Sequence, residues 1–144
     1  MVLRYIDYEI ELLNLAPGIE NSANNLKKYD FEYGGNKNST VQHVVLLKQN
    51  GKVVKSVVLN GGKAQTSIHA KSAIVFDDMI IVCVSNRVYC LYLPSLAQRW
   101  VKEIDEIACL QIFKTSESYL IHGELGITRI DFDGNIIWSF SGAD

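Results

Sequence analysis

The sequence predicts an all-β, antiparallel domain made of about three four-stranded, blade-like repeats. Short runs rich in Val, Ile, Tyr and Phe alternate with glycine and Asx residues, and only two prolines interrupt the 144 residues. Asn50-Gly51 and Asp133-Gly134 are strong hairpin signals, because two-residue turns favour residues that adopt positive φ. Trp100 and Trp138 lie 38 residues apart in similar surroundings, which indicates a repeat.

The strands can be assigned in chain order from hydrophobic alternation and turn residues. One is expected near the N-terminus, around residues 4–10. Between Ala16 and Lys28 the pattern changes, and Pro17 with the polar run after it predicts a short helix near 17–28 or a loop. The remaining strands are expected at 29–34, 41–48, 52–58, 73–76, 79–84, 87–93, 98–103, 109–113, 118–123, 126–132 and 135–140.

A self-comparison indicates one domain over 1–144 with clear repeats at 72–104 and 108–142 and a weaker one at 29–60. In the clear copies residues 79–83 match 118–122, and residues 88–91 match 127–130. In the weak copy residues 44–54 lie 83 positions before 127–137. A period near 40 with four strands per copy lies in the range of a β-propeller blade.

The hairpin of 79–84 with 87–93 predicts how the repeats pack. A turn at Ser85-Asn86 pairs Val84 with Arg87, and alternation then makes both faces of the hairpin apolar. Both faces should therefore be covered, as in the middle of a stack. Three repeats are too few to close a propeller. Either the N-terminal strand joins a twisted sandwich, or two chains associate, or the chain is a piece of a longer one; we favour a compact β domain able to dimerise.

Composition and charge exclude several functions. With 14 basic and 16 acidic residues the chain carries −2, so it has no positive field to attract nucleic acid or an anionic membrane. No apolar run approaches the roughly 18 residues that span a bilayer, and residues 1–9 lack the core of a signal peptide. We therefore expect a cytoplasmic protein. Its three cysteines, Cys83, Cys90 and Cys109, lie in apolar stretches and should pack in the core as free thiols.

Two segments resemble known families. Residues 133–140 (DGNIIWSF) and their counterpart 93–100 (LPSLAQRW) resemble the blade repeat of PQQ-type, quinoprotein-like propellers, in which a turn, two or three residues and a Trp mark the outer strand. The resemblance implies a propeller-like fold. The pattern HGE…DGxIxWxFSGxD over residues 122–144 is also similar to a group of small uncharacterised bacterial proteins, which implies no known activity. Because a shared fold does not carry function, we expect no cofactor.

Chemistry-bearing residues are few. His122 and Glu124 are two apart and would share a face of a continuing strand, so with His69 they are the candidate metal ligands, or the centre of a hydrolase. The alternative is a turn at 123–126 with Glu124 solvated. No HExxH, paired CxxC or GxSxG pattern completes a site, so the sequence favours a non-catalytic role over an enzyme.

Aromatic residues provide the remaining functional signal. Trp100, Trp138 and Tyr119 are the candidate protein-binding residues, since such side chains offer large area with little entropy to lose. They would serve equally in sheet cores. The leading hypothesis is a propeller-like binding or scaffold domain that contacts another protein or its own copy. A specific version is a small neutralising protein of the immunity type.

Overall fold

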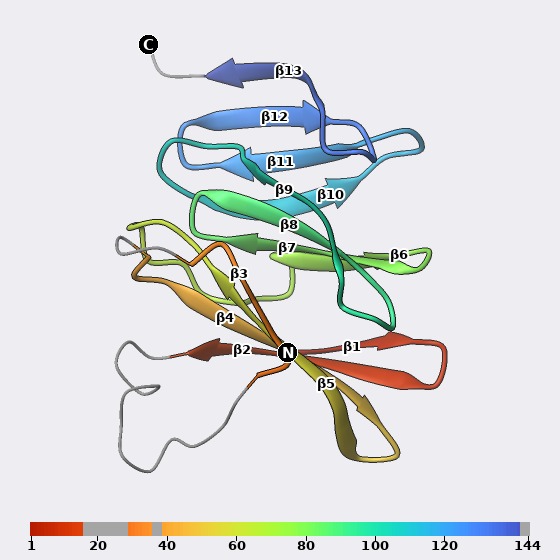
Figure 1. The fold of residues 1–144 in the computed structure, drawn as a ribbon. Coiled ribbons are helices and arrows are strands. Elements are labelled where there is room, and N and C mark those ends of the chain that lie inside the picture. The colour runs from red at the N-terminus through yellow and green to blue at the C-terminus, as the bar shows by residue number, and fades with distance from the viewer. Residues whose placement is uncertain (16–28, 36–38, 142–144) are drawn as a thin grey trace.

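The computed structural model describes residues 1–15, 29–35 and 39–141. Within these ranges the chain forms thirteen strands and no helix, which confirms the all-β prediction. The strands make three mostly antiparallel sheets. Figure 1 shows the sheets as three layers, stacked in chain order from the red and yellow strands to the blue ones. The helix or loop expected near 17–28 lies outside the described residues.

The first sheet has five strands, and two strands that pair in it, β2 and β4, are separated by residues 16–41 of the sequence. Its strand order is β1-β2-β4-β5-β3. β3 pairs with β5 in parallel, whereas the other pairs are antiparallel. The strands are β1 (Val2–Tyr5), β2 (Tyr8–Leu15), β3 (Phe31–Tyr33), β4 (Gln42–Gln49) and β5 (Lys52–Asn60).

The second and third sheets are four-stranded meanders whose strands pair in chain order. Their bounds match the expected strands to within about two residues at each end. The second sheet contains β6 (Ala73–Phe76), β7 (Met79–Val84), β8 (Arg87–Tyr92) and β9 (Gln98–Glu103). The third contains β10 (Cys109–Lys114), β11 (Tyr119–Gly123), β12 (Gly126–Ile130) and β13 (Ile136–Ser141).

The N-terminal strand joins the first sheet, but as a hairpin. The single strand expected around residues 4–10 is divided by a turn at Ile6-Asp7, so that Tyr5 pairs with Tyr8. Ile6 has a φ of 53°, a conformation that isoleucine rarely adopts. No glycine or asparagine marks this turn, which is why the sequence predicts one continuous strand there.

The central hairpin has the predicted register. Val84 pairs with Arg87, and Ile81 pairs with Cys90. The face that carries Ile80 and Val82 packs in a core shared with the first sheet. The face that carries Ile81 and Cys90 packs in a second core shared with the third sheet. The second sheet is therefore covered on both sides, as its two apolar faces predicted.

Register pairing reveals the same row of residues across every sheet, which we call the main row. It takes one residue from each of four neighbouring strands: β1, β2, β4 and β5 in the first sheet, β6 to β9 in the second, and β10 to β13 in the third. We call the last strand of each set the outer strand. The main row is Leu3, Ile10, Leu47 and Lys55 in the first sheet, Ile74, Ile81, Cys90 and Trp100 in the second, and Phe113, Leu120, Arg129 and Trp138 in the third.

A shared irregularity supports this equivalence. In each sheet one extra residue bulges from the outer strand directly before its main-row residue: Val54, Arg99 and Ile137. A bulge bends the strand and redirects the side chains beside it. The same bulge at the same place gives the outer strands of the three sheets equivalent geometry.

The equivalence corrects one part of the sequence alignment. An offset of 83 matches Val54 with Ile137, as expected, but it would match Arg129 with Leu46. In the structure the equivalent of Arg129 is Leu47, because the turn before the outer strand is one residue longer in the third sheet than in the first. A slip of one residue moves a side chain to the opposite face of a strand.

His43, in the first sheet, gives the fold a pH dependence. Its side chain is 1% exposed, and Nε2 donates a hydrogen bond to the Thr66 carbonyl at 3.2 Å. Burial lowers the pKa of His43 below the ordinary value, outweighing that hydrogen bond. The unfolded chain therefore binds a proton here at a pH at which the folded chain does not, and stability falls as the pH drops below about 6.5.

We expect the midpoint of thermal unfolding to fall between pH 7.5 and 5.5, and to fall less in His43→Gln, which cannot titrate. Circular dichroism at a series of pH values measures this. The lowered pKa values of Glu11 and Asp131 act below that window, because both start from the ordinary values of carboxyl groups. An equal pH dependence in the two proteins would contradict the assignment to His43.

Candidate functional site

The third sheet presents its main row to solvent. The main rows of the first and second sheets face the next sheet of the stack, and all their residues except Lys55 belong to the core between the two sheets. No further sheet follows in the part of the chain that the structure describes. Trp138 is 43% exposed, whereas its counterpart Trp100 packs against the second core. We call this surface the open face: Phe113, Leu120, Arg129 and Trp138 of the main row, with His122, Ile127 and Phe140 of the adjacent row.

The open face is largely apolar. Phe113 and Ile127 are each 40% exposed, and Phe140 is 64% exposed. Contiguous exposed apolar residues on a sheet are typical of an interaction surface, since isolated ones are the norm elsewhere. A hollow of about 400 Å³ adjoins the face, lined by residues 122–127 and Phe140.

The opposite end of the stack is different. The outward face of the first sheet carries Glu9, Glu11 and Lys48, and Lys48 Nζ lies 2.7 Å from a Glu11 carboxylate oxygen. The hydrogen bond from Lys48 lowers the pKa of Glu11. At the equivalent positions the second sheet has the fully buried Ile80, Val82 and Leu91. Charged residues at these positions suit a terminal repeat, although Val44 and Val58 on the same face are buried.

The outer edge of the third sheet is also exposed. All six residues of β13 are exposed, and none is charged. In the second sheet the equivalent strand β9 carries Arg99, Lys102 and Glu103, and in the first sheet β3 covers β5. Charge and coverage are two ways in which proteins protect sheet edges. The third sheet uses neither along β13 within the described residues.

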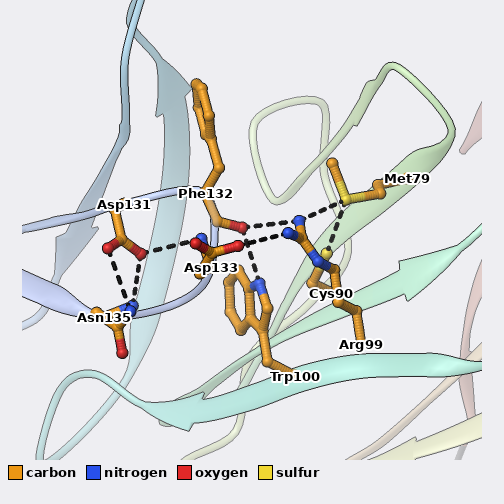
Figure 2. A network of polar contacts seen from close by, with 8 residues as sticks. All are labelled: Met79, Cys90, Arg99, Trp100, Asp131, Phe132, Asp133 and Asn135. Atoms are coloured by element: carbon orange, nitrogen blue, oxygen red, sulfur yellow. Dashed lines mark hydrogen bonds and ion pairs between the residues drawn. The ribbon is translucent and has the colours of Figure 1, made fainter.

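The junction between the second and third sheets shows how a covered main row binds its neighbour (Figure 2). Trp100 donates from Nε1 to the Phe132 carbonyl at 3.1 Å, and Arg99 donates to the same carbonyl at 3.0 Å. Arg99 also forms an ion pair with Asp133. Both residues thus hold the β12–β13 turn of the next sheet.

That turn is shaped to fit under the indole ring. Gly134 has a φ of +87°, and a Cβ there would lie 2.6 Å from the ring of Trp100. Asp131 accepts backbone hydrogen bonds from Asn135 at 2.8 Å and Asp133 at 2.9 Å, and these bonds lower its pKa. The hairpin signal at Asp133-Gly134 therefore reflects contact between sheets as well as local turn geometry.

The three predicted protein-binding residues occupy different environments. Trp138 lies on the open face, Trp100 lies at the junction, and Tyr119 is 0% exposed in the core between the second and third sheets. Tyr119 packs edge-on against Phe76 and Phe132 there. Of the three residues, Trp138 is exposed, Trp100 is partly buried and Tyr119 is fully buried.

Tyr119 gives a stability prediction. Its buried hydroxyl has no hydrogen-bond partner among the described residues, and burying such a group costs about 1–3 kcal/mol. Tyr119→Phe should therefore raise the free energy of unfolding by about 1 kcal/mol, as measured by urea denaturation. Tyr119→Leu, which also removes ring contacts, should lower it. A loss of stability in Tyr119→Phe would mean that the hydroxyl is paired.

The predicted metal residues are engaged in separate contacts. His69 donates from Nε2 to the Leu110 carbonyl at 2.9 Å and accepts from the Lys71 amide at Nδ1. His122 Nδ1 lies 3.3 Å from the Gln111 side chain, and Glu124 lines the hollow beside it. Within the described ranges no three His, Cys, Asp or Glu residues form a group that could hold a metal ion.

The cysteines are buried free thiols, as the sequence predicted. Burial raises the pKa of Cys90 to about 11 and that of Cys109 to about 12, and raises the pKa of Cys83 well above the ordinary value. Because the thiolate is the reactive form, these side chains are poor nucleophiles.

Comparison with protein-family models and with curated proteins finds no match to this chain. A helix able to cross a membrane is not found in the described part of the chain. Sequence reasoning identifies Trp138 but misses Phe113, Leu120, Ile127, Arg129 and Phe140 as its neighbours. The available signal is that Phe113, Leu120 and Ile127 match apolar positions of the preceding repeat, whereas Phe140 matches Lys102 and has no such signal.

Proposed function

We propose that the protein is a non-catalytic binding or scaffold domain whose open face binds another protein. One observation carries the proposal: on its inner three strands the open face repeats, position for position, residues that pack in the two cores of the same molecule. Covering the open face removes apolar area from water, which is favourable by about 25 cal/mol for each Å² buried. A small neutralising protein of immunity type is one form that such a domain takes. The resemblance to PQQ-type blades supports the architecture, and no quinone is part of this proposal.

The binding face can be tested with a photo-cross-linking amino acid at single positions of the full chain. Placed at Trp138 in the cells that produce the protein, it should give a discrete cross-linked protein product. The matched control position is Ile6, 82% exposed at the charged end of the stack, which should give none. Ile127→Asp, which puts a charge on the open face, should abolish the product from position 138.

Two results would contradict the proposal. One is equal cross-linking from positions 6 and 138, which indicates random collision. The other is a product from position 138 that persists unchanged in Ile127→Asp, since a specific apolar interface does not tolerate an unpaired charge.

A further inference from the structure

The covered main row shows what a neighbour must offer. At the junction between the second and third sheets, Trp100 and Arg99 receive a hairpin turn through a carbonyl, a carboxylate and a glycine. The indole needs an acceptor and a flat surface, and the guanidinium needs an anion. These requirements come from side-chain chemistry, so they hold wherever the same pair of groups recurs.

The open face also has an arginine beside its tryptophan, but from the neighbouring strand, since Ile137 occupies the position of Arg99. Arg129 lies directly across from Trp138 in the register of β12 and β13. Its Nε donates to the Ser118 hydroxyl at 2.8 Å, and no carboxylate of the described residues lies within ion-pair distance of its guanidinium. The equivalents of Arg129 in the two covered rows are Leu47 and Cys90, which are uncharged.

A cation at this point limits what can cover the face. Burying a charge is costly unless a group of opposite sign pairs with it. Neither row of the open face contains an aspartate or a glutamate. A second copy docked through the same face would therefore bring Arg129 toward another Arg129 without supplying a carboxylate.

Head-to-tail association of two copies is also disfavoured. It would place the open face on the outward face of the first sheet, where Glu11 and Lys48 already form an ion pair. The surfaces that receive a main row inside the molecule are apolar at these positions, with Ile80 and Leu91 in the second sheet. Docking there would bury Glu9, Glu11 and Lys48 in order to pair the single charge of Arg129.

We infer that the open face takes a blade-like β-sheet of another protein. This sheet presents an apolar face to Leu120 and Ile127, and a hairpin turn that offers a backbone carbonyl to Trp138 and a carboxylate to Arg129. The inference rests on the proposed function and names the chemistry of the partner. It is based on the junction between the second and third sheets, where a turn carbonyl meets Trp100 and a turn carboxylate meets Arg99 within the chain.

The probe is the full chain extended after Ser141 by a second copy of residues 104–141. This copy contains the kind of sheet and turn that covers Trp100, and the linkage presents it at an effective concentration near 1 mM. The extended chain should be monomeric, its added residues should be protected from amide hydrogen exchange, and acrylamide should quench Trp138 less than in the parent. Light scattering should give the parent a mass of 16.2 kDa.

The role of Arg129 is tested in the same chain. Changing aspartate to asparagine in the appended turn, at the copy of Asp133, should lower the docking constant about tenfold. In Arg129→Leu, which restores the residue type of the first sheet, the same change should have no effect. An equal loss in both backgrounds would overturn the pairing of a partner carboxylate with Arg129.

Other outcomes overturn the inference as a whole. The first is an added segment whose amides exchange as fast as those of an unfolded chain. The second is an extended chain that oligomerises through its added sheet. The third is a parent chain that is a dimer by light scattering and becomes a monomer in Ile127→Asp. The first two leave a discrete cross-link from position 138 intact, so the failure of this inference is distinguishable from failure of the proposed function.

Discussion

Ile80→Ala and Ile81→Ala are each expected to lower the free energy of unfolding by about 3 kcal/mol. Adjacent residues of a strand point to opposite faces, and in a sheet with one solvent face only one of them would matter. Both isoleucines are fully buried, one in each core of the molecule. Urea denaturation of the two variants measures the loss of unfolding free energy on each side of β7, and therefore in each core.

The third sheet should respond unequally to the same pair of changes. Ile121→Ala should cost about 3 kcal/mol, because Ile121 is fully buried in the second core. Leu120→Ala, on the open face, should cost about 1 kcal/mol or less. Similar losses at positions 120 and 121 would mean that the open face is covered within the chain.

The second large effect is expected at the tryptophans. Trp100→Ala should destabilise the protein by about 3 kcal/mol, because it removes ring contacts at the junction and the hydrogen bond to Phe132. Trp138→Ala should cost less than about 1 kcal/mol, because its ring is 43% exposed and it makes no such bond among the described residues. Thermal and urea unfolding of the two variants provide the comparison.

Trp100→Phe separates packing from hydrogen bonding. It keeps an aromatic ring over Gly134 but cannot donate to the Phe132 carbonyl, so the stability of this variant should fall between those of wild type and Trp100→Ala. If Trp138→Ala lost as much stability as Trp100→Ala, the two tryptophans would have equivalent surroundings, and Trp138 would not lie on an open face.

The second and third sheets could be predicted almost completely from the sequence. Their strands and turns are short, and each meander keeps neighbouring strands adjacent in sequence. Because alternation across Ser85-Asn86 makes both faces of the hairpin apolar, even the covering of the second sheet could be derived. In this part of the chain local pattern and tertiary packing agree.

The first sheet could not be predicted so well, because its repeat is interrupted. The sequence predicts the weak repeat at 29–60, whereas the sheet also takes β1 and β2 from residues 2–15. The segment between β2 and β4 separates strands that pair in space, and a repeat search along the chain does not join them. A turn at Ile6 without glycine or asparagine conceals the hairpin that begins the sheet.

The candidate site could be predicted only in part. Trp100 and Trp138 have the same place in the repeat, so the sequence alone could not show that one is packed and the other exposed. That difference arises from position in the stack. Tyr119 shares with them the character of an aromatic strand residue, but its strand position faces the preceding sheet. Arg129 belongs to no sequence motif, and only the structure shows that it lies beside Trp138 on the open face.

Trp100 and Trp138 are structural equivalents, one covered by the next sheet and one open, and the interpretation of the open face depends on this difference. Acrylamide quenching of two single-tryptophan chains, Trp138→Phe and Trp100→Phe, tests it most directly. We expect weak quenching when Trp100 remains and strong quenching, near that of a solvent-exposed indole, when Trp138 remains. Equal quenching of the two folded chains, or the reverse order, would contradict it.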